Sequence, residues 1–113
     1  MPKFTPQQLD ELYHQTLAEF AASPEKWTSF LDTAARLYKY DFKSQVLIWS
    51  QRPDATACAE LPLWNDRLHR RVNRGSNGIG IVDNSSNQPR IKYLFDISDT
   101  SPRDQSVAPP YIW

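Results

Sequence analysis

The 113-residue chain contains a single cysteine, Cys58, and has no net charge at neutral pH. One cysteine cannot form a disulfide within the chain or build a thiolate-based metal site. We therefore expect Cys58 to be a small core residue and not a nucleophile, in a reducing, cytoplasmic compartment. Because 13 basic side chains balance 13 acidic ones, the molecule as a whole has no field that would attract a polyanion.

Long apolar runs are missing as well. No stretch approaches the roughly 18 consecutive apolar residues that a membrane-spanning helix requires. The N-terminal sequence, MPKFTPQQLDELYHQ, lacks the apolar segment of a signal peptide. The sequence therefore predicts a soluble protein that has no membrane partner.

Common catalytic and cofactor motifs are absent: there is no HExxH, P-loop, GxSxG or CxxC. Gly75, Gly78 and Gly80 form a G-x-x-G-x-G pattern, but a dinucleotide fingerprint requires a helix after it, and the residues here alternate like a strand. His14 and His69 have no partner at the spacing of a metal site or a general base. We expect no catalytic residue, no metal and no cofactor, and hence no enzyme.

The first half of the chain has a strong helical pattern. With 40% hydrophobic and 12% aromatic residues, the chain can form one domain with a core. Apolar residues recur at three- and four-residue spacing over residues 6–22, 24–38 and 42–51. Thr5, Ser23 and Asp41 precede these stretches and are residue types that cap helices, and the first two are followed by proline. The pattern predicts three helices.

These helices should bury one face each. In the second helix we expect a continuous and mostly buried stripe of Trp27, Phe30, Leu31, Ala34, Leu37 and Tyr38. In the third helix the expected inward residues are Val46, Leu47 and Trp49, with Phe42 as a further candidate. Lys43, Ser44 and Gln45 are expected to be exposed.

The second half has the signals of short strands. Residues 55–61 fit either a strand or a buried turn, residues 84–89 form a polar turn, and residues 90–97 alternate as a strand does. From Ser98 to Pro110 the composition indicates an irregular tail. The sequence therefore predicts an α+β fold, in which about three N-terminal helices pack on a small antiparallel β-sheet arranged as a meander.

The segment from Trp64 to Ile81 contains four arginines and one acidic residue. It predicts a short helix or bend, a strand with an arginine-rich face, a tight turn and a return strand. Residues 36–92 hold ten basic and five acidic residues, whereas the two flanks hold three and eight, which is compatible with a basic face on a neutral domain. In a strand, Arg70 and Arg71 would point to opposite faces, so not all the arginines can share one surface.

Arginine suits phosphate, and aromatic rings stack on bases, so this layout is typical of single-stranded nucleic-acid binding. The candidate phosphate contacts are Arg67, Arg70, Arg74 and Lys43, followed by Arg52 and Lys92. The candidate stacking residues are Trp64, Trp49 and Tyr40, of which at least one is expected to be buried instead. The alternative interpretation places the arginines on a solvated hairpin and the aromatics in the core.

Several short signals follow one another along the chain. They are Trp27-x-x-Phe30, Tyr38-x-Tyr40, Gln45-Val46-Leu47-Ile48, Arg52-Pro53-Asp54-Ala55-Thr56, Trp64-x5-Arg70-x-Val72-x-Arg74-Gly75, Gly78-Ile79 and Phe95-Asp96-Ile97-Ser98-Asp99-Thr100. In this order they resemble the N-terminal domain of the antirestriction protein ArdC, and more closely the version at the start of very large helicase- or methylase-like proteins of conjugative elements in Gram-positive bacteria. The resemblance covers residues 27–100. The chain departs from it at Gln45, where the family often has Asn, and at Arg74-Gly75-Ser76, where it has a Lys-Gly-Glu-like turn.

The resemblance implies binding of single-stranded DNA in the bacterial cytoplasm. In ArdC a metalloprotease-like domain follows, but its zinc motif is absent from this chain, so protease activity is not implied. We expect residues 1–100 to form the domain and residues 101–113 to link it to an absent downstream region, whose domains would be further partners. The expected function is non-sequence-specific single-stranded DNA binding within a larger conjugation or antirestriction protein. The alternative is a protein-interaction or scaffolding domain that docks a neighbouring domain or partner, and the apolar end Tyr111-Ile112-Trp113 favours it.

Overall fold

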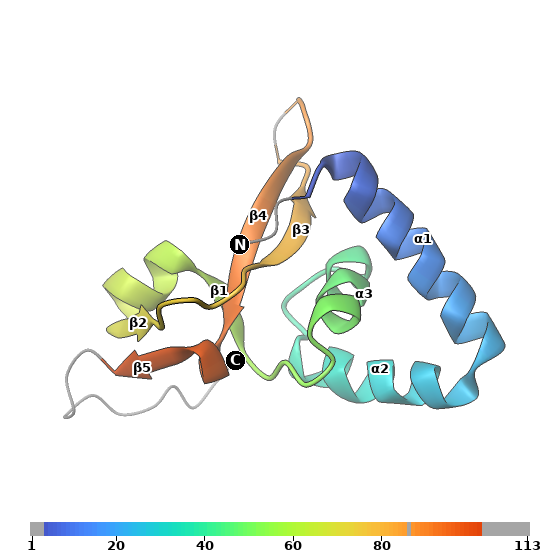
Figure 1. Ribbon diagram of the computed structural model, residues 1–113, viewed down its shortest axis with the longest axis horizontal. Helices are drawn as coiled ribbons and strands as arrows, with labels where there is room; N and C mark the ends of the chain where they lie inside the picture. Colours follow the sequence, from blue (N-terminus) through green and yellow to red (C-terminus); the bar gives the residue numbers. More distant parts are fainter. Residues whose placement is uncertain (1–3, 86, 103–113) are drawn as a thin grey trace.

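A computed structural model describes residues 4–85 and 87–102 of the chain. This part has the predicted α+β fold, with three helices followed by short strands (Figure 1). The helices are α1 (Pro6–Ala22), α2 (Pro24–Arg36) and α3 (Phe42–Gln51). The strands are β1 (Cys58–Glu60), β2 (Arg70–Val72), β3 (Ile79–Asp83), β4 (Arg90–Asp96) and β5 (Thr100–Pro102). A π-helical turn at Leu63–Arg67 follows β1, and a 3-10 turn at Ile97–Asp99 precedes β5.

The three predicted capping residues all cap their helices. The Thr5 hydroxyl accepts from the backbone N–H of Gln8 at 3.1 Å, and the Gln8 side chain accepts from Thr5 N–H at 2.9 Å, a reciprocal capping box. Ser23 and Asp41 accept from backbone N–H groups in the first turns of α2 and α3. The predicted bounds of α1 and α3 are confirmed, whereas α2 ends at Arg36, because Leu37 leaves helical geometry.

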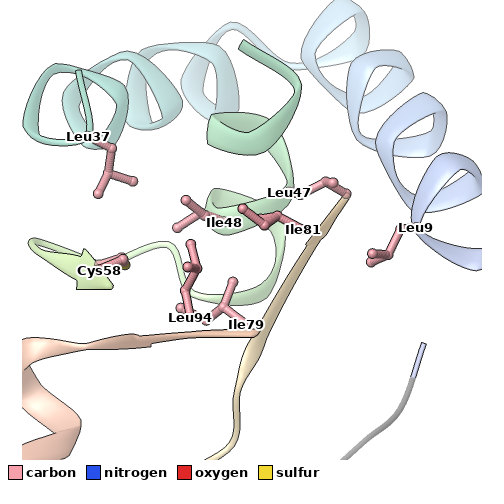
Figure 2. Packing of buried hydrophobic residues seen from close by; sticks show 9 residues of the cluster. Leu9, Leu37, Leu47, Ile48, Cys58, Ile79, Ile81 and Leu94 are labelled. Atoms are coloured by element: carbon pink, nitrogen blue, oxygen red, sulfur yellow. The ribbon is translucent and has the colours of Figure 1, made fainter. Parts of the chain in front are cut away.

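The main core lies between α3 and the sheet (Figure 2). It is a cluster of Leu9, Leu37, Leu47, Ile48, Ala55, Cys58, Ile79, Ile81 and Leu94. A second cluster joins the three helices through Phe20, Phe30, Val46 and Trp49. A third, on the far side of β4, contains Ala59, Trp64 and Phe95. Because Leu94 and Phe95 are adjacent in β4 and enter different clusters, this strand is covered on both faces.

The expected burial of α2 is wrong for half of its stripe. Phe30 and Leu37 are buried, but Trp27, Leu31 and Tyr38 are 39%, 46% and 60% exposed. The helix lies at the edge of the molecule and packs against α1 and α3 (Figure 1). A helix with neighbours on one side only buries a narrow stripe.

In α3 the side chains of Val46, Leu47 and Trp49 are buried as expected, whereas Phe42 is 45% exposed. Ser44 is buried, which contradicts the expected exposure, because α3 lies between the sheet and the other two helices and even its first turn is covered. Its two neighbours, Lys43 and Gln45, are half-buried.

The larger sheet has the strand order β1-β4-β3 and is antiparallel. Strands β3 and β4 form a hairpin in which Ile79 faces Leu94 and Asp83 faces Arg90. The ambiguous segment 55–61 supplies β1, which joins the free edge of β4 with Cys58 opposite Asp96. Among the strands that the structure describes, only β3 and β4 are therefore both consecutive in sequence and paired.

The predicted return strand for the arginine strand is wrong. Strand β2 pairs with β5, in the register Arg70 to Pro102 and Val72 to Thr100, and β3 belongs to the other sheet. Between β2 and β3 the chain turns at Gly75, whose φ of 85° lies in the left-handed region that glycine tolerates. A backbone hydrogen bond from Asn73 N–H to the Asp99 carbonyl, 2.8 Å long, holds the end of β2 against the 3-10 turn.

This pairing also overturns the prediction of an irregular stretch from Ser98. The 3-10 turn and β5 occupy residues 97–102, so ordered structure continues two residues past the expected domain limit of residue 100. Three-residue strands carry too little alternation to be recognised in sequence. Residues 103–113, which include most of the expected linker and the apolar end Tyr111-Ile112-Trp113, lie outside the described residues.

Candidate nucleic-acid interface

Residues 63–76, here called the arginine segment, are fastened to the body of the protein by Trp64. This side chain is fully buried against Ala59 and Phe95, and its indole N–H donates to the Phe95 carbonyl at 2.9 Å. The Leu68 N–H closes the π-helical turn on the Leu63 carbonyl at 3.1 Å. In this structure Trp64 is an anchor, and it has no exposed face on which a base could stack, contrary to the prediction.

Arg70 fastens the other end of the segment. It is 8% exposed, its Nε donates to the Thr100 hydroxyl at 2.7 Å, and its Nη2 donates to the Thr100 carbonyl at 3.2 Å. The Thr100 hydroxyl in turn donates to the Ile97 carbonyl at 2.7 Å. The guanidinium predicted to bind phosphate is therefore committed largely to holding β5 against β2.

Three arginines of the segment remain available. Arg67, Arg71 and Arg74 are exposed, and none makes an ion pair or a side-chain hydrogen bond within the described part of the chain. Arg71 was not among the predicted contacts. Its exposure could have been predicted from the alternation of side chains along a strand, because Arg71 points to the opposite face of β2 when Arg70 is buried.

The other predicted cations are neutralised by acidic neighbours. Lys43 donates to Asp10 at 2.9 Å, Arg52 to Asp99 at 2.7 Å and to Asp54 at 3.1 Å, and Lys92 to Glu60 at 3.0 Å. The bond to Asp99 raises the pKa of Arg52, and the bond to Glu60 raises the pKa of Lys92, so both stay charged. Partly exposed ion pairs of this kind are weak, but each cation already has a partner with which a phosphate would compete.

Of the three candidate stacking residues, only Tyr40 reaches the surface. Trp49 is 8% exposed, packs on Phe20 at 5.2 Å between ring centroids, and donates its indole N–H to the Ser29 hydroxyl. The expectation that at least one of the three is buried is confirmed, for both tryptophans. The Tyr40 hydroxyl donates to the Cys58 carbonyl at 2.6 Å, and this hydrogen bond holds the ring in one position. Burial raises the pKa of the hydroxyl, so it keeps the proton that it donates.

An open groove of about 680 Å³ lies beside the arginine segment. It is bounded by the turn before α3, by β1, by the π-helical turn and by the β3–β4 hairpin. Its lining residues are Lys39, Tyr40, Asp41, Ser44, Ala59, Glu60, Pro62, Leu63, Asp66, Arg67, Ile81, Val82, Asp83, Asn84, Lys92 and Leu94. The fold thus brings three predicted residues from distant places, Tyr40, Arg67 and Lys92, to one surface.

The groove contains more carboxylates than cations. Lys39, Arg67 and Lys92 line it together with Asp41, Glu60, Asp66 and Asp83. The sequence identifies Asp41 only as a helix cap and gives no sign that these four acids share a surface, because they come from four separate elements. This balance disfavours a phosphate inside the groove, and it suits a neutral ligand that has both hydrogen-bond donors and acceptors.

Comparisons with protein-family models, with curated proteins and with solved structures found no match to this chain. Within the described residues, no cluster of three or more histidine, cysteine or carboxylate side chains could hold a metal ion. No helix in the same part of the chain is both long and apolar enough to cross a membrane.

Proposed function

We propose that this chain is a single-stranded DNA-binding module that recognises the DNA backbone without sequence specificity. The observation that carries the proposal is the set of exposed arginines Arg67, Arg71 and Arg74, which have no acidic partner in the described part of the chain. By contrast, Lys26, Lys43, Arg52 and Lys92 are all paired with carboxylates. Arg67, Arg71 and Arg74 therefore place three exposed cations, with no acidic partner among the described residues, within eight residues, whereas Arg90, also exposed and outside these ion pairs, lies apart from them on β4.

The way the segment is held supports the same function. Trp64 fastens one end and the Arg70–Thr100 hydrogen bonds fasten the other, so the three exposed guanidinium groups extend from a braced backbone. Bracing lowers the entropy that is lost when a ligand orders the segment. Guanidinium groups remain charged at any relevant pH and donate paired hydrogen bonds to phosphate oxygens.

The resemblance to the N-terminal domain of ArdC supports the proposal independently of the geometry. It leads us to propose that the chain is one module of a larger bacterial protein of a mobile element, acting in conjugation or restriction evasion. On this proposal the module binds and does not catalyse.

The test is fluorescence anisotropy of a labelled single-stranded oligonucleotide of about 20 nucleotides. If Arg67, Arg71 and Arg74 each neutralise one phosphate, the log–log dependence of affinity on salt should have a slope of about −2. In an Arg71→Ala/Arg74→Ala variant the slope should fall to about −0.7 and binding at low salt should weaken at least tenfold.

A matched control is Lys26→Ala/Arg90→Ala, which removes the same charge from α2 and from the start of β4. It should retain the affinity and salt slope of the wild type within about twofold. Equal losses in the two variants would show that only total charge matters. Absence of binding at low salt would refute the proposal for this chain.

The exposed apolar side chains around α2 favour a second candidate, a protein-interaction domain. Trp27 and Leu31 lie one turn apart on α2, and Tyr38 and Phe42 follow it, all four being more than a third exposed. Exposed aromatics that gather in one region often mark a contact surface. A docking surface of this kind would bind its partner with little dependence on salt and would lose affinity in a Trp27→Ser/Leu31→Ser variant, in contrast to the arginine-dependent binding of DNA.

A further inference from the structure

We infer that the groove beside the arginine segment holds one unpaired base of the bound strand, and that it prefers a base with an amino group, such as cytosine, over thymine. This inference rests on the proposed function. It assigns the phosphates to the exposed arginines and one base to the groove.

Position and size support this division. Arg67 belongs both to the arginine segment and to the groove wall, so a strand held by the exposed arginines passes the mouth of the groove. The volume of about 680 Å³ is in the range of small-molecule sites, roughly 300–1,000 Å³, and exceeds what one base requires. Bases of single strands are free to turn out of the stack into such a site.

The apolar part of the lining suits the flat face of a base. Tyr40 lines the groove and is half-buried, whereas Ile81 and Leu94, which also line it, belong to the main core and are 5% and 2% exposed, so Tyr40 is the one of these three with surface to offer a base. The hydrogen bond from the Tyr40 hydroxyl to the Cys58 carbonyl fixes this ring before any ligand binds. Contact with a fixed aromatic ring is the usual way in which proteins hold an unpaired base.

The polar part of the lining suits the edge of a base. Lys92 lies between two carboxylates, 3.0 Å from a Glu60 oxygen and 3.8 Å from an Asp83 oxygen. The Glu60 side chain is 44% exposed, and Lys92 contacts only its Oε1. Ionised carboxylates only accept hydrogen bonds.

Selectivity follows from this excess of acceptors. Cytosine presents its N4 amino group, a donor, at the position where thymine presents O4, an acceptor. An amino group can donate to Glu60, whereas a thymine O4 at the same place would meet a carboxylate with no proton between them. The four carboxylates in the lining also repel phosphate, which keeps the strand's backbone outside the groove.

The experiment compares (dC) and (dT) oligonucleotides of about 20 nucleotides at neutral pH, by anisotropy, at one moderate salt concentration. Wild-type protein should bind the cytosine strand about fivefold more tightly, the lower end of what one specific base contact provides. In Glu60→Gln the ratio should approach one, because an amide both donates and accepts. The salt slope should steepen by no more than about 0.7, because the arginines stay in place and Lys92, which loses the charge of Glu60 but keeps Asp83 at 3.8 Å, can contact at most one further phosphate.

The matched control is Glu19→Gln on α1, where the carboxylate is similarly exposed and lies 3.6 Å from one lysine, Lys26. It should retain the cytosine preference, and circular dichroism should show that both variants are folded. Equal binding of both strands by the wild type, or a cytosine preference that survives Glu60→Gln, would overturn the inference about the groove. The proposed function would still stand if binding remained salt-sensitive and dependent on the arginines. Absence of binding to either strand would overturn both.

Discussion

At the scale of single residues, Asp96 is a buried carboxylate that several hydrogen bonds hold in place. It is 1% exposed and ends β4. One carboxylate oxygen accepts from the N–H groups of Thr56 and Ala57 at 2.8 and 3.0 Å, and the other accepts from the Ser98 hydroxyl at 2.6 Å. Burial alone would raise the pKa of Asp96, but the hydrogen bonds from Ser98, Thr56 and Ala57 outweigh burial and lower it.

A lowered folded-state pKa predicts a specific acid dependence. The unfolded chain binds a proton at Asp96 near pH 3.9, and the folded protein only at lower pH. The stabilisation from Asp96 is therefore complete above about pH 5 and is lost as the pH falls through about 4 toward the folded pKa. Asp96→Asn should lower the free energy of unfolding by about 1–3 kcal/mol at pH 7 and should flatten its decline between pH 5 and 3.

Urea denaturation across this pH range measures both effects. Asp32→Asn, on the exposed surface of α2, is the control and should leave the curve within about 0.5 kcal/mol of the wild type. An Asp96→Asn protein as stable as the wild type at pH 7 would show that the hydrogen bonds to Asp96 contribute little.

At the scale of elements, the β2–β5 pair determines where the arginine segment lies. It consists of two three-residue strands, which alone are marginal in water. The burial of Arg70 and its two hydrogen bonds to Thr100 add stability that the short β2–β5 pair does not have from its backbone hydrogen bonds alone. If the protein binds DNA as proposed, this side chain would contribute indirectly, by holding the strand that carries Arg71 and leads to Arg74.

Thr100→Val tests this role with little change of volume. The substitution removes the oxygen that accepts from Arg70 and leaves a buried N–H without a partner, which should cost about 1–3 kcal/mol. Hydrogen exchange should become faster in β2 and β5 than in the β3–β4 hairpin. Ser101→Ala removes only an exposed hydrogen bond, to Asn73 at 2.7 Å, and should cost less than about 1 kcal/mol. Similar losses in the two variants would contradict a special role for Thr100.

At the scale of the whole molecule, charge is arranged unevenly on a chain with no net charge. Helices α1 and α2 lie toward one end of a molecule whose longest dimension is 46 Å, and the arginine segment lies toward the other (Figure 1). Salt at about 0.1 M screens exposed charges over about 10 Å. The acidic residues of α1 and α2 should therefore have little influence on a strand bound at the arginines.

Glu11→Gln/Asp32→Asn tests that independence. It raises the net charge by two through exposed residues of α1 and α2. Affinity for single-stranded DNA at about 0.1 M salt should change less than about twofold, because these sites lie beyond the screening length. An increase of tenfold or more, measured by anisotropy, would mean that total charge governs binding.

Local sequence signals predicted the helices well and the smaller sheet poorly. Thr5, Ser23 and Asp41 determine where helices begin through contacts a few residues away, so the bounds of α1 and α3 could be read from the sequence. The pairing of β2 with β5 depends on contacts about 30 residues apart in sequence, such as Arg70 with Thr100. Nothing within the segment 98–102 distinguishes it from a loop.

The candidate site was predictable only in part for the same reason. The exposed arginines follow from composition, but whether Arg70 or Arg71 faces solvent depends on which face of β2 the rest of the fold covers. Burial of Trp64 requires a pocket supplied by Ala59 and Phe95. The groove depends on Glu60, Asp66 and Asp83, which approach one another only in the folded chain.

The separation of β2 from β5 in sequence has a consequence during synthesis. Ribosomes make chains N-terminus first, at about 5–20 residues per second, so β2 emerges on the order of one to six seconds before its partner. Over that interval the helices can already form from local contacts, while Arg70 has no Thr100 to bind. A nascent chain would therefore present an unbraced run of arginines next to the RNA-rich ribosome surface, and completion of β5 would set its final geometry.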